Sequence, residues 1–287
     1  MKRRRIIINN DFYNIFQLAS RITDEDVYAA VDKIAGTQVD TLCLMIDLFS
    51  IGDGGMVAPE LIKLYSHPHT DPVINNLIAF YKEGKDPFEM ILKRAKEKGI
   101  EFLASIRMND THYKDHIYHI WVDQFYYDHL HQRVGEGESR GGAEFDYRVS
   151  EIRDYYFNRI KGTLEKYDVD GIELDMTRNC MFFPRGNDYS GHTEECAPIM
   201  TDFIRKIREL LNEYGRKRKK ELVLSIVVPY SLYKCRLEGL DLPTWARLGY
   251  IDMVCFSTPF LADFDLSLIH ISEPTRLLSI SYAVFCL

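Results

Sequence analysis

Residues 167–178, with the sequence YDVDGIELDMTR, form the most informative stretch of the chain. They indicate a helix end, a turn and a short strand that finishes on Asp175. Side chains alternate between the two faces of a strand, so Ile172 and Leu174 share one face while Glu173 and Asp175 share the other. Two carboxyl groups on one face of a short apolar strand are costly to bury unless they are paired or used. The pattern predicts a barrel wall whose acids point toward the mouth and whose apolar side chains face helices.

The residues that flank this strand support the same interpretation. Gly171 indicates a tight turn between the preceding helix and the strand. Arg178 follows Asp175 by three residues, which is near enough to keep a carboxylate ionised. A purely structural brace between Asp175 and Arg178 at the strand end is the alternative.

Strand and helix signals alternate along the chain. Apolar or β-branched runs predict five further strands, near residues 5–9, 39–48, 100–106, 221–228 and 251–256. A capping box at Thr23 and Asp26 predicts one helix start, and Asp86 before Pro87 predicts another. Six β-α alternations predict a parallel sheet.

Polar side chains gather just after the predicted strand ends. They are Asn9, Asn10, Asp11, Asp47, Asp53, Asn109, Asp110, Asp175, Arg178, Ser257 and Thr258. A (β/α)₈ barrel builds its site at that face, from the ends of several strands. A doubly wound sheet often shows a Gly-rich phosphate turn, which is absent after the first strand. We therefore predict an α/β fold of (β/α)₈ TIM-barrel type, truncated after about strand six.

The end of the chain has a different character. LSLIHISEPTR and ISYAVFCL, within residues 266–287, resemble translated sequencing-adapter DNA in one reading frame. We expect residues 1–265 to form an incomplete barrel domain of catalytic type and residues 266–287 to be a non-native tail. The alternative is a genuine apolar pair of strands.

Composition excludes several classes of function. The chain has 46% apolar and 28% charged residues and a net charge of −7, which argues against nucleic acid as a partner. No run is long enough to span a membrane, and the N-terminus lacks a signal-peptide pattern. The five cysteines before the tail show no CxxC spacing, so we expect reduced thiols and a cytoplasmic location.

Residues 168–175, DVDGIELD, resemble the fourth-strand motif of the family 10-like glycosyl hydrolases, which is roughly D-G-[IV]-x-[LF]-D-x-x-R. Residues 105–110 (SIRMND) and the turn at 53–55 resemble a bacterial branch of that group. The resemblance implies a barrel glycosidase with a catalytic or substrate-binding acid at this strand end. The group often has an aromatic residue after the aspartate, whereas this chain has Met176, which argues against ring stacking at this position.

Glycoside cleavage needs two carboxyl groups, about 5–5.5 Å apart for retention and about 6.5–9.5 Å apart for inversion of configuration. Asp175 is the candidate for the nucleophile or charge-stabilising group. Asp110 and Glu173 compete as its partner, and strands beyond the sixth could also supply it. The substrate-binding candidates are Asn9, Asp11, Asp47, Asp53, Arg107, Asn109 and Arg178. We predict that these acids and amides line one concave mouth. Arg107 could equally be structural.

Two further clusters follow the third predicted strand. The aromatic residues Trp121, Phe125, Tyr126 and Tyr127 could form a stacking wall, although helical spacing favours local core. Five histidines, His112, His116, His119, His129 and His131, have spacings that could share zinc, but the HExxH arrangement is missing.

We therefore expect no metal and no cofactor, and we expect a carbohydrate partner rather than nucleic acid or a membrane. The predicted function is that of a glycosidase-like protein acting through carboxylates. The alternatives are a non-catalytic carbohydrate-binding barrel and a metal-dependent hydrolase that uses the histidine loop.

Overall fold

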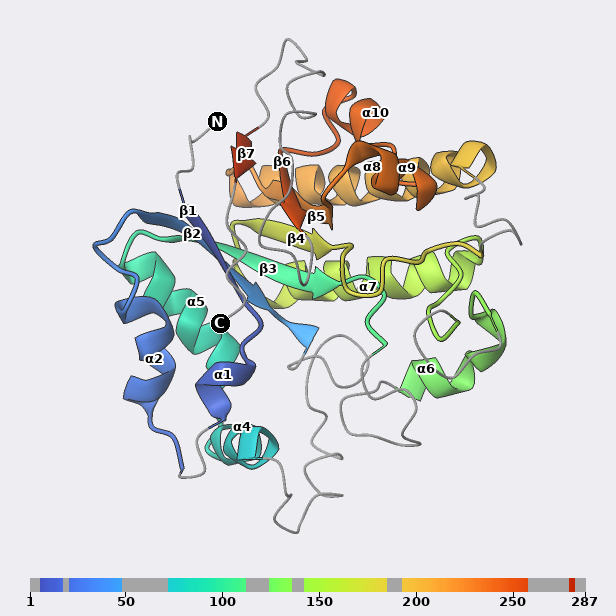
Figure 1. The fold of residues 1–287 in the computed structure, drawn as a ribbon. Helices are drawn as coiled ribbons and strands as arrows, with labels where there is room; N and C mark the ends of the chain where they lie inside the picture. The colour runs from blue at the N-terminus through green and yellow to red at the C-terminus, as the bar shows by residue number, and fades with distance from the viewer. Residues whose placement is uncertain are drawn as a thin grey trace.

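The computed structural model describes residues 6–17, 21–47, 72–111, 124–135, 142–184, 193–257 and 279–281. One curled sheet runs through them, with helices on its convex side (Figure 1). Its strands are β1 (Ile6–Asn10), β2 (Val39–Met45), β3 (Glu101–Arg107), β4 (Gly171–Asp175), β5 (Val223–Pro229), β6 (Met253–Ser257) and β7 (Ser279–Ser281). Every neighbouring pair is parallel, and the strands follow one another in chain order. This confirms the predicted order of the first six strands.

The helices fill the connections between the strands. They are α1 (Tyr13–Phe16), α2 (Asp24–Asp32), α4 (Pro72–Lys82), α5 (Pro87–Glu97), α6 (Gln124–Asp128), α7 (Ser150–Lys166), α8 (Thr193–Arg218), α9 (Leu232–Leu237) and α10 (Leu242–Arg247), with a 3₁₀ turn, η2, at Leu130–Gln132. In Figure 1, α2 and α5 lie beside β1–β3, and α7 and α8 lie beside β3–β5. No helix in the described ranges is long and apolar enough to cross a membrane.

Both predicted helix starts are confirmed. Thr23 caps α2 through a reciprocal capping box with Asp26. Asp86 caps α5 by accepting from two backbone N–H groups, and Pro87 occupies the first helical position. These caps satisfy N–H groups that a helix cannot pair internally.

The two faces of the sheet have separate cores. Ile172 and Leu174 belong to the large core between the sheet and the helices, as the alternation predicts. The concave face carries a smaller cluster of Ile7, Cys43, Leu103, Val227, Met253 and Cys255. The acids of β4 therefore share the concave face with this small cluster, which positions them inside the curl.

Gly171 has a different role from the predicted tight turn. It is the first residue of β4, and its φ is not among the positive values. A Cβ atom at this position would lie 2.3 Å from the Val223 carbonyl oxygen. Glycine is needed because β5 approaches β4 closely here, and this corrects the prediction of a turn.

β7 falls within the tail that the sequence predicts to be non-native. Its three residues pair with β6, from Met253–Ser279 to Cys255–Ser281.

Candidate active site

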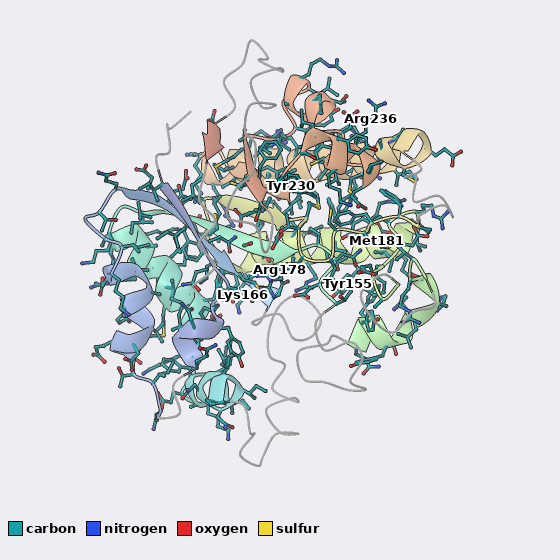
Figure 2. The ribbon with its side chains drawn as sticks, viewed as in Figure 1. Tyr155, Lys166, Arg178, Met181, Tyr230 and Arg236 are labelled. Carbon is teal, nitrogen blue, oxygen red and sulfur yellow. The ribbon has the colours of Figure 1, made fainter. Side chains whose placement is uncertain are left out.

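Asp175 and Arg107 are the last residues of two adjacent strands and stand opposite each other in the register. Asp175 is 8% exposed. Its Oδ1 accepts hydrogen bonds from the Thr177 backbone N–H at 2.8 Å and from the Thr177 hydroxyl at 2.6 Å. Its Oδ2 lies 3.9 Å from Arg178 Nε. The ion pair of the structural brace therefore exists, but its N–O distance is long. The turn after β4, more than Arg178, orients the carboxylate. Figure 2 shows Arg178 in the central part of the molecule.

Arg107 joins a carboxylate that follows its own strand to carboxylates from two other segments of the chain. Its guanidinium donates to Asp110 Oδ2 at 2.8 Å and lies 3.6 Å from Asp11 Oδ2. Its backbone N–H donates to Asp47 Oδ2 at 2.7 Å. The ends of β1, β2 and β3 thus bring their acids to one place, next to the end of β4.

Asp47 has a second partner that the sequence did not indicate. Arg159 Nη2 on α7 donates to Asp47 Oδ1 at 2.6 Å. Burial raises the pKa of the Asp47 carboxyl, although the Arg159 charge and the Arg107 N–H oppose the shift. Arg159 and Asp47 are far apart in the chain and form no motif, so only the folded helix could identify this contact.

Glu173 lies one layer deeper than Asp175, as predicted, and is 1% exposed. Asn9 Nδ2 donates to its Oε1, and the side chains of Cys43 and Ser105 also hydrogen-bond to it. Burial raises the pKa of Glu173 to about 7, with the Asp175 charge as a further cause and the three hydrogen bonds opposing it. Glu173 is therefore close to half-protonated near neutral pH.

Asn109 does not line the mouth. It is fully buried, its amide nitrogen donates to the Phe145 carbonyl at 3.0 Å and the Met181 carbonyl at 2.8 Å, and its oxygen accepts from the Phe145 N–H at 2.9 Å. All of these groups are backbone groups, so Asn109 connects the loop at Phe145 to the loop at Met181 by hydrogen bonds. This corrects its predicted substrate-binding role. Asp53 lies outside the described residues.

The aromatic residues after β3 form local core where they are described. The Phe125 ring stacks on His129 at 3.8 Å and on Tyr155 at 4.0 Å between centroids. Tyr126 is 3% exposed and contacts Phe145. Trp121 lies outside the described residues.

The histidine cluster is only partly described. His129 uses both ring nitrogens, Nδ1 with the Phe125 carbonyl at 2.7 Å and Nε2 with Glu151 at 3.3 Å. Within the ranges that the structure covers, no three His, Cys, Asp or Glu side chains are placed to hold a metal ion. His112, His116 and His119 lie outside those ranges.

Comparisons with known proteins give the fold. No protein-family model matches the chain, and no curated protein matches it. Among solved structures, a cycloisomaltooligosaccharide glucanotransferase from Paenibacillus sp. has a TM-score of 0.51 and 11% identity, covering 89% of this chain and 34% of that chain. An Anoxybacillus alpha-amylase has a TM-score of 0.50 and 13% identity, covering 88% of this chain and 52% of that chain.

These likenesses, together with the six parallel strands, show an α/β fold of the truncated TIM-barrel type. The chain spans between about a third and about a half of the length of these two structures.

Proposed function

We propose that this protein is a barrel glycosidase that acts on a polysaccharide or glycoconjugate at the carboxyl edge of its sheet. One observation carries the proposal. The register places Asp175 beside Arg107, and Arg107 gathers Asp11 and Asp110 around the same point. Catalytic residues of such barrels come from the ends of several strands. The two solved structures of the same fold are a glucanotransferase, complexed with cycloisomaltoheptaose, and an amylase, which supports a carbohydrate substrate.

In this proposal Asp175 is the charged group that attacks or stabilises the developing positive charge at the sugar C1. The two hydrogen bonds from Thr177 both go to Oδ1 of Asp175. In the proposal, the other oxygen, Oδ2, faces the substrate. Prepared geometry of this kind lowers the cost of reorganisation at the transition state.

Asp110 is the proposed acid–base partner. It lies three residues beyond the end of β3, and its side chain is 24% exposed, whereas Glu173 is enclosed. Glu173 instead controls the local charge, because an ionised Glu173 repels the Asp175 carboxylate.

The sugar hydroxyls would meet Asn9, Asp11, Asp47, Arg107 and Arg178, with Asp53 as a further proposed member of the set. Planar donors and acceptors of this kind can bind pairs of neighbouring hydroxyls.

A non-catalytic carbohydrate-binding barrel is the second candidate. The observation that favours it is that Asp110 is already held by Arg107 at 2.8 Å, while Glu173 is buried. In that case Asp175 would lack an acid–base partner among the described residues.

Measuring both turnover and binding on the same panel separates the two candidates. Starch, dextran, xylan, carboxymethylcellulose and chitooligosaccharides would be tested for release of reducing ends and for retardation in affinity gels. Release of reducing ends that is lost in Asp110→Asn supports the hydrolase. Retardation without release on any substrate supports the binding barrel.

A further inference from the structure

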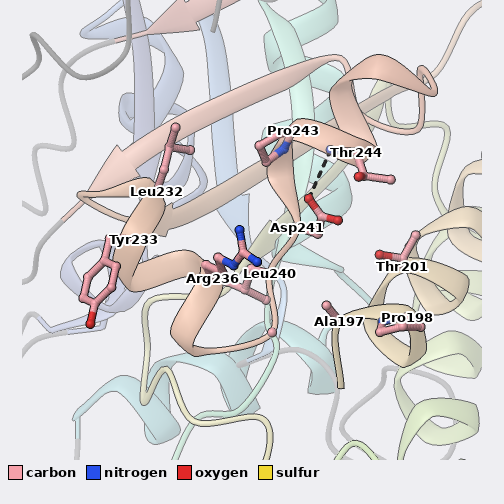
Figure 3. A pocket seen from close by; sticks show the side chains of 11 residues that line it. Ala197, Pro198, Thr201, Leu232, Tyr233, Arg236, Leu240, Asp241, Pro243 and Thr244 are labelled. Atoms are coloured by element: carbon pink, nitrogen blue, oxygen red, sulfur yellow. Dashed lines mark hydrogen bonds between the residues drawn. The ribbon is translucent and has the colours of Figure 1, made fainter. Parts of the chain in front are cut away.

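A cavity of about 660 Å³ lies between helices α8, α9 and α10, and none of the carboxylates of the mouth lines it. It is bounded by the first turns of α8, by α9 and by the segment leading into α10 (Figure 3). Its walls are mainly carbon, and its polar side chains are Thr201, Tyr233, Arg236, Asp241 and Thr244. None of these residues takes part in the proposed active site.

Tyr233 and Arg236 form one side of the cavity. Tyr233 is 74% exposed, whereas the other exposed large apolar side chains in the described ranges are 43–46% exposed. Arg236 follows it by three residues on α9, so the two side chains lie on the same face of the helix. Among the described residues, no ion pair or hydrogen bond involves the Arg236 guanidinium.

Asp241 and two hydroxyl groups line the opposite side. Asp241 Oδ1 accepts from the Thr244 backbone N–H at 3.2 Å and caps α10, which leaves Oδ2 available as an acceptor. Thr201 Oγ1 accepts from Trp245 Nε1 at 2.8 Å, so its own hydroxyl hydrogen can be donated.

The charges and shapes of these groups select one class of ligand. Arg236 and Asp241 have opposite signs, so the cavity as a whole favours a neutral ligand over an anion or a cation. An aromatic ring offers a flat apolar surface, and Arg, Asp and Thr offer both donors and acceptors. A pyranose ring has one apolar face and a rim of hydroxyls, which matches both sets of groups.

We propose that this cavity is a second carbohydrate-binding site, which takes a pyranose unit of a neutral oligosaccharide between Tyr233 and Asp241. The site binds without cleaving, and it does not depend on the proposed active site being catalytic.

Trp245 provides an optical signal for the site. It is fully buried, and its indole N–H donates to Thr201, which lines the cavity. A ligand hydroxyl that engages Thr201 would change the environment of the indole and hence its emission. The chain has two tryptophans, so Trp121→Phe leaves Trp245 as the single reporter.

The experiment titrates the full chain carrying Trp121→Phe with maltoheptaose, isomaltoheptaose, cellohexaose, xylohexaose and chitohexaose. We expect saturable binding of at least one of them with a change in Trp245 emission. Tyr233→Ala should weaken this binding about tenfold or more, and Arg236→Ala should also weaken it. Asp175→Asn should leave it unchanged, as should Tyr230→Ala, which removes an exposed tyrosine that does not line the cavity.

The proposal is overturned if none of the five sugars binds, or if binding survives both Tyr233→Ala and Arg236→Ala. Loss of binding in Asp175→Asn alone would place the sugar in the mouth instead. Tyr233 and Arg236 are exposed, so their truncation should leave the melting temperature unchanged. Arg236→Lys keeps the positive charge and provides a second, more conservative variant at this position. An inactive protein whose sugar binding still depends on Tyr233 would overturn the proposed hydrolase and support this site.

Discussion

At the scale of single residues, Glu173 shows how burial sets the electrostatics of the mouth. The carboxyl group lies below Asp175 on the same strand and accepts hydrogen bonds from three side chains, yet burial still raises its pKa to about 7. Ser225 stands opposite it in the β4–β5 register, and its buried hydroxyl has no partner among the described residues.

The raised pKa predicts how stability depends on pH. An unfolded glutamate has a pKa near 4.5, so the folded protein holds this proton more tightly. The stabilisation is therefore fully present below pH 4.5 and is lost as pH rises through about 7. The loss amounts to about 3 kcal/mol. Urea unfolding should show that the free energy of unfolding of the wild type, relative to that of Glu173→Gln, falls by this amount between pH 4.5 and pH 8.

Glu221→Gln is the control for this measurement because Glu221 is exposed. If the stability difference between wild type and Glu173→Gln were the same at both pH values, Glu173 would titrate normally and the burial argument would fail.

The placement of some of these side chains follows from local sequence, whereas that of others depends on partners far away in the chain. Alternation along a strand is local, so the inward direction of Glu173 and Asp175 could be predicted. Asn109 could not, because its partners Phe145 and Met181 are 36 and 72 residues away. Arg159 was missed for the same reason, since it meets Asp47 across 112 residues.

At the scale of elements, β4 depends on a close approach to β5. Strand existence and order were predictable from apolar runs and capping signals, because these are also local. The register was not predictable, and the need for glycine at position 171 follows from the register, since Val223 stands opposite it.

Gly171→Ala should test this contact. A methyl group 2.3 Å from the Val223 carbonyl oxygen must push the strands apart. We expect a loss of about 2–3 kcal/mol in unfolding free energy, together with lower activity per folded molecule because Asp175 ends the same strand.

Gly84→Ala is the matched control. Gly84 has a φ of +72° and open space around its Cβ position, so its substitution should cost about 1–2 kcal/mol through backbone strain alone. Its activity per folded molecule should be unchanged. Equal activity in both variants would show that β4 tolerates the methyl group without moving the site.

At the scale of the whole molecule, the sheet is parallel and curled, and β1 is one of its edges. Inner strands have hydrogen-bonded neighbours on both sides, whereas β1 pairs only with β2 among the described strands. The edge should therefore open more readily than the centre.

Hydrogen exchange on the native protein would measure this difference. We expect the amides of β3 and β4 to exchange slowest and those of β1 to exchange faster, at a lower opening free energy. Protection of β1 equal to that of β3 and β4 would mean that its outer edge is paired by another segment or chain.

We propose that the carboxylate of Asp175 carries the chemistry, and a comparison of catalysis with and without its charge tests this proposal. The measured quantity is the ratio of kcat/KM between wild type and Asp175→Asn on the substrate that releases most reducing ends. The change keeps the shape of the side chain and removes its charge. Asp202→Asn, on the exposed face of α8, is the control. We predict a fall on the order of 10²–10³-fold for Asp175→Asn and none for the control. An Asp175→Asn protein that hydrolyses the substrate at the wild-type rate would contradict the account and leave Asp175 as part of the scaffold.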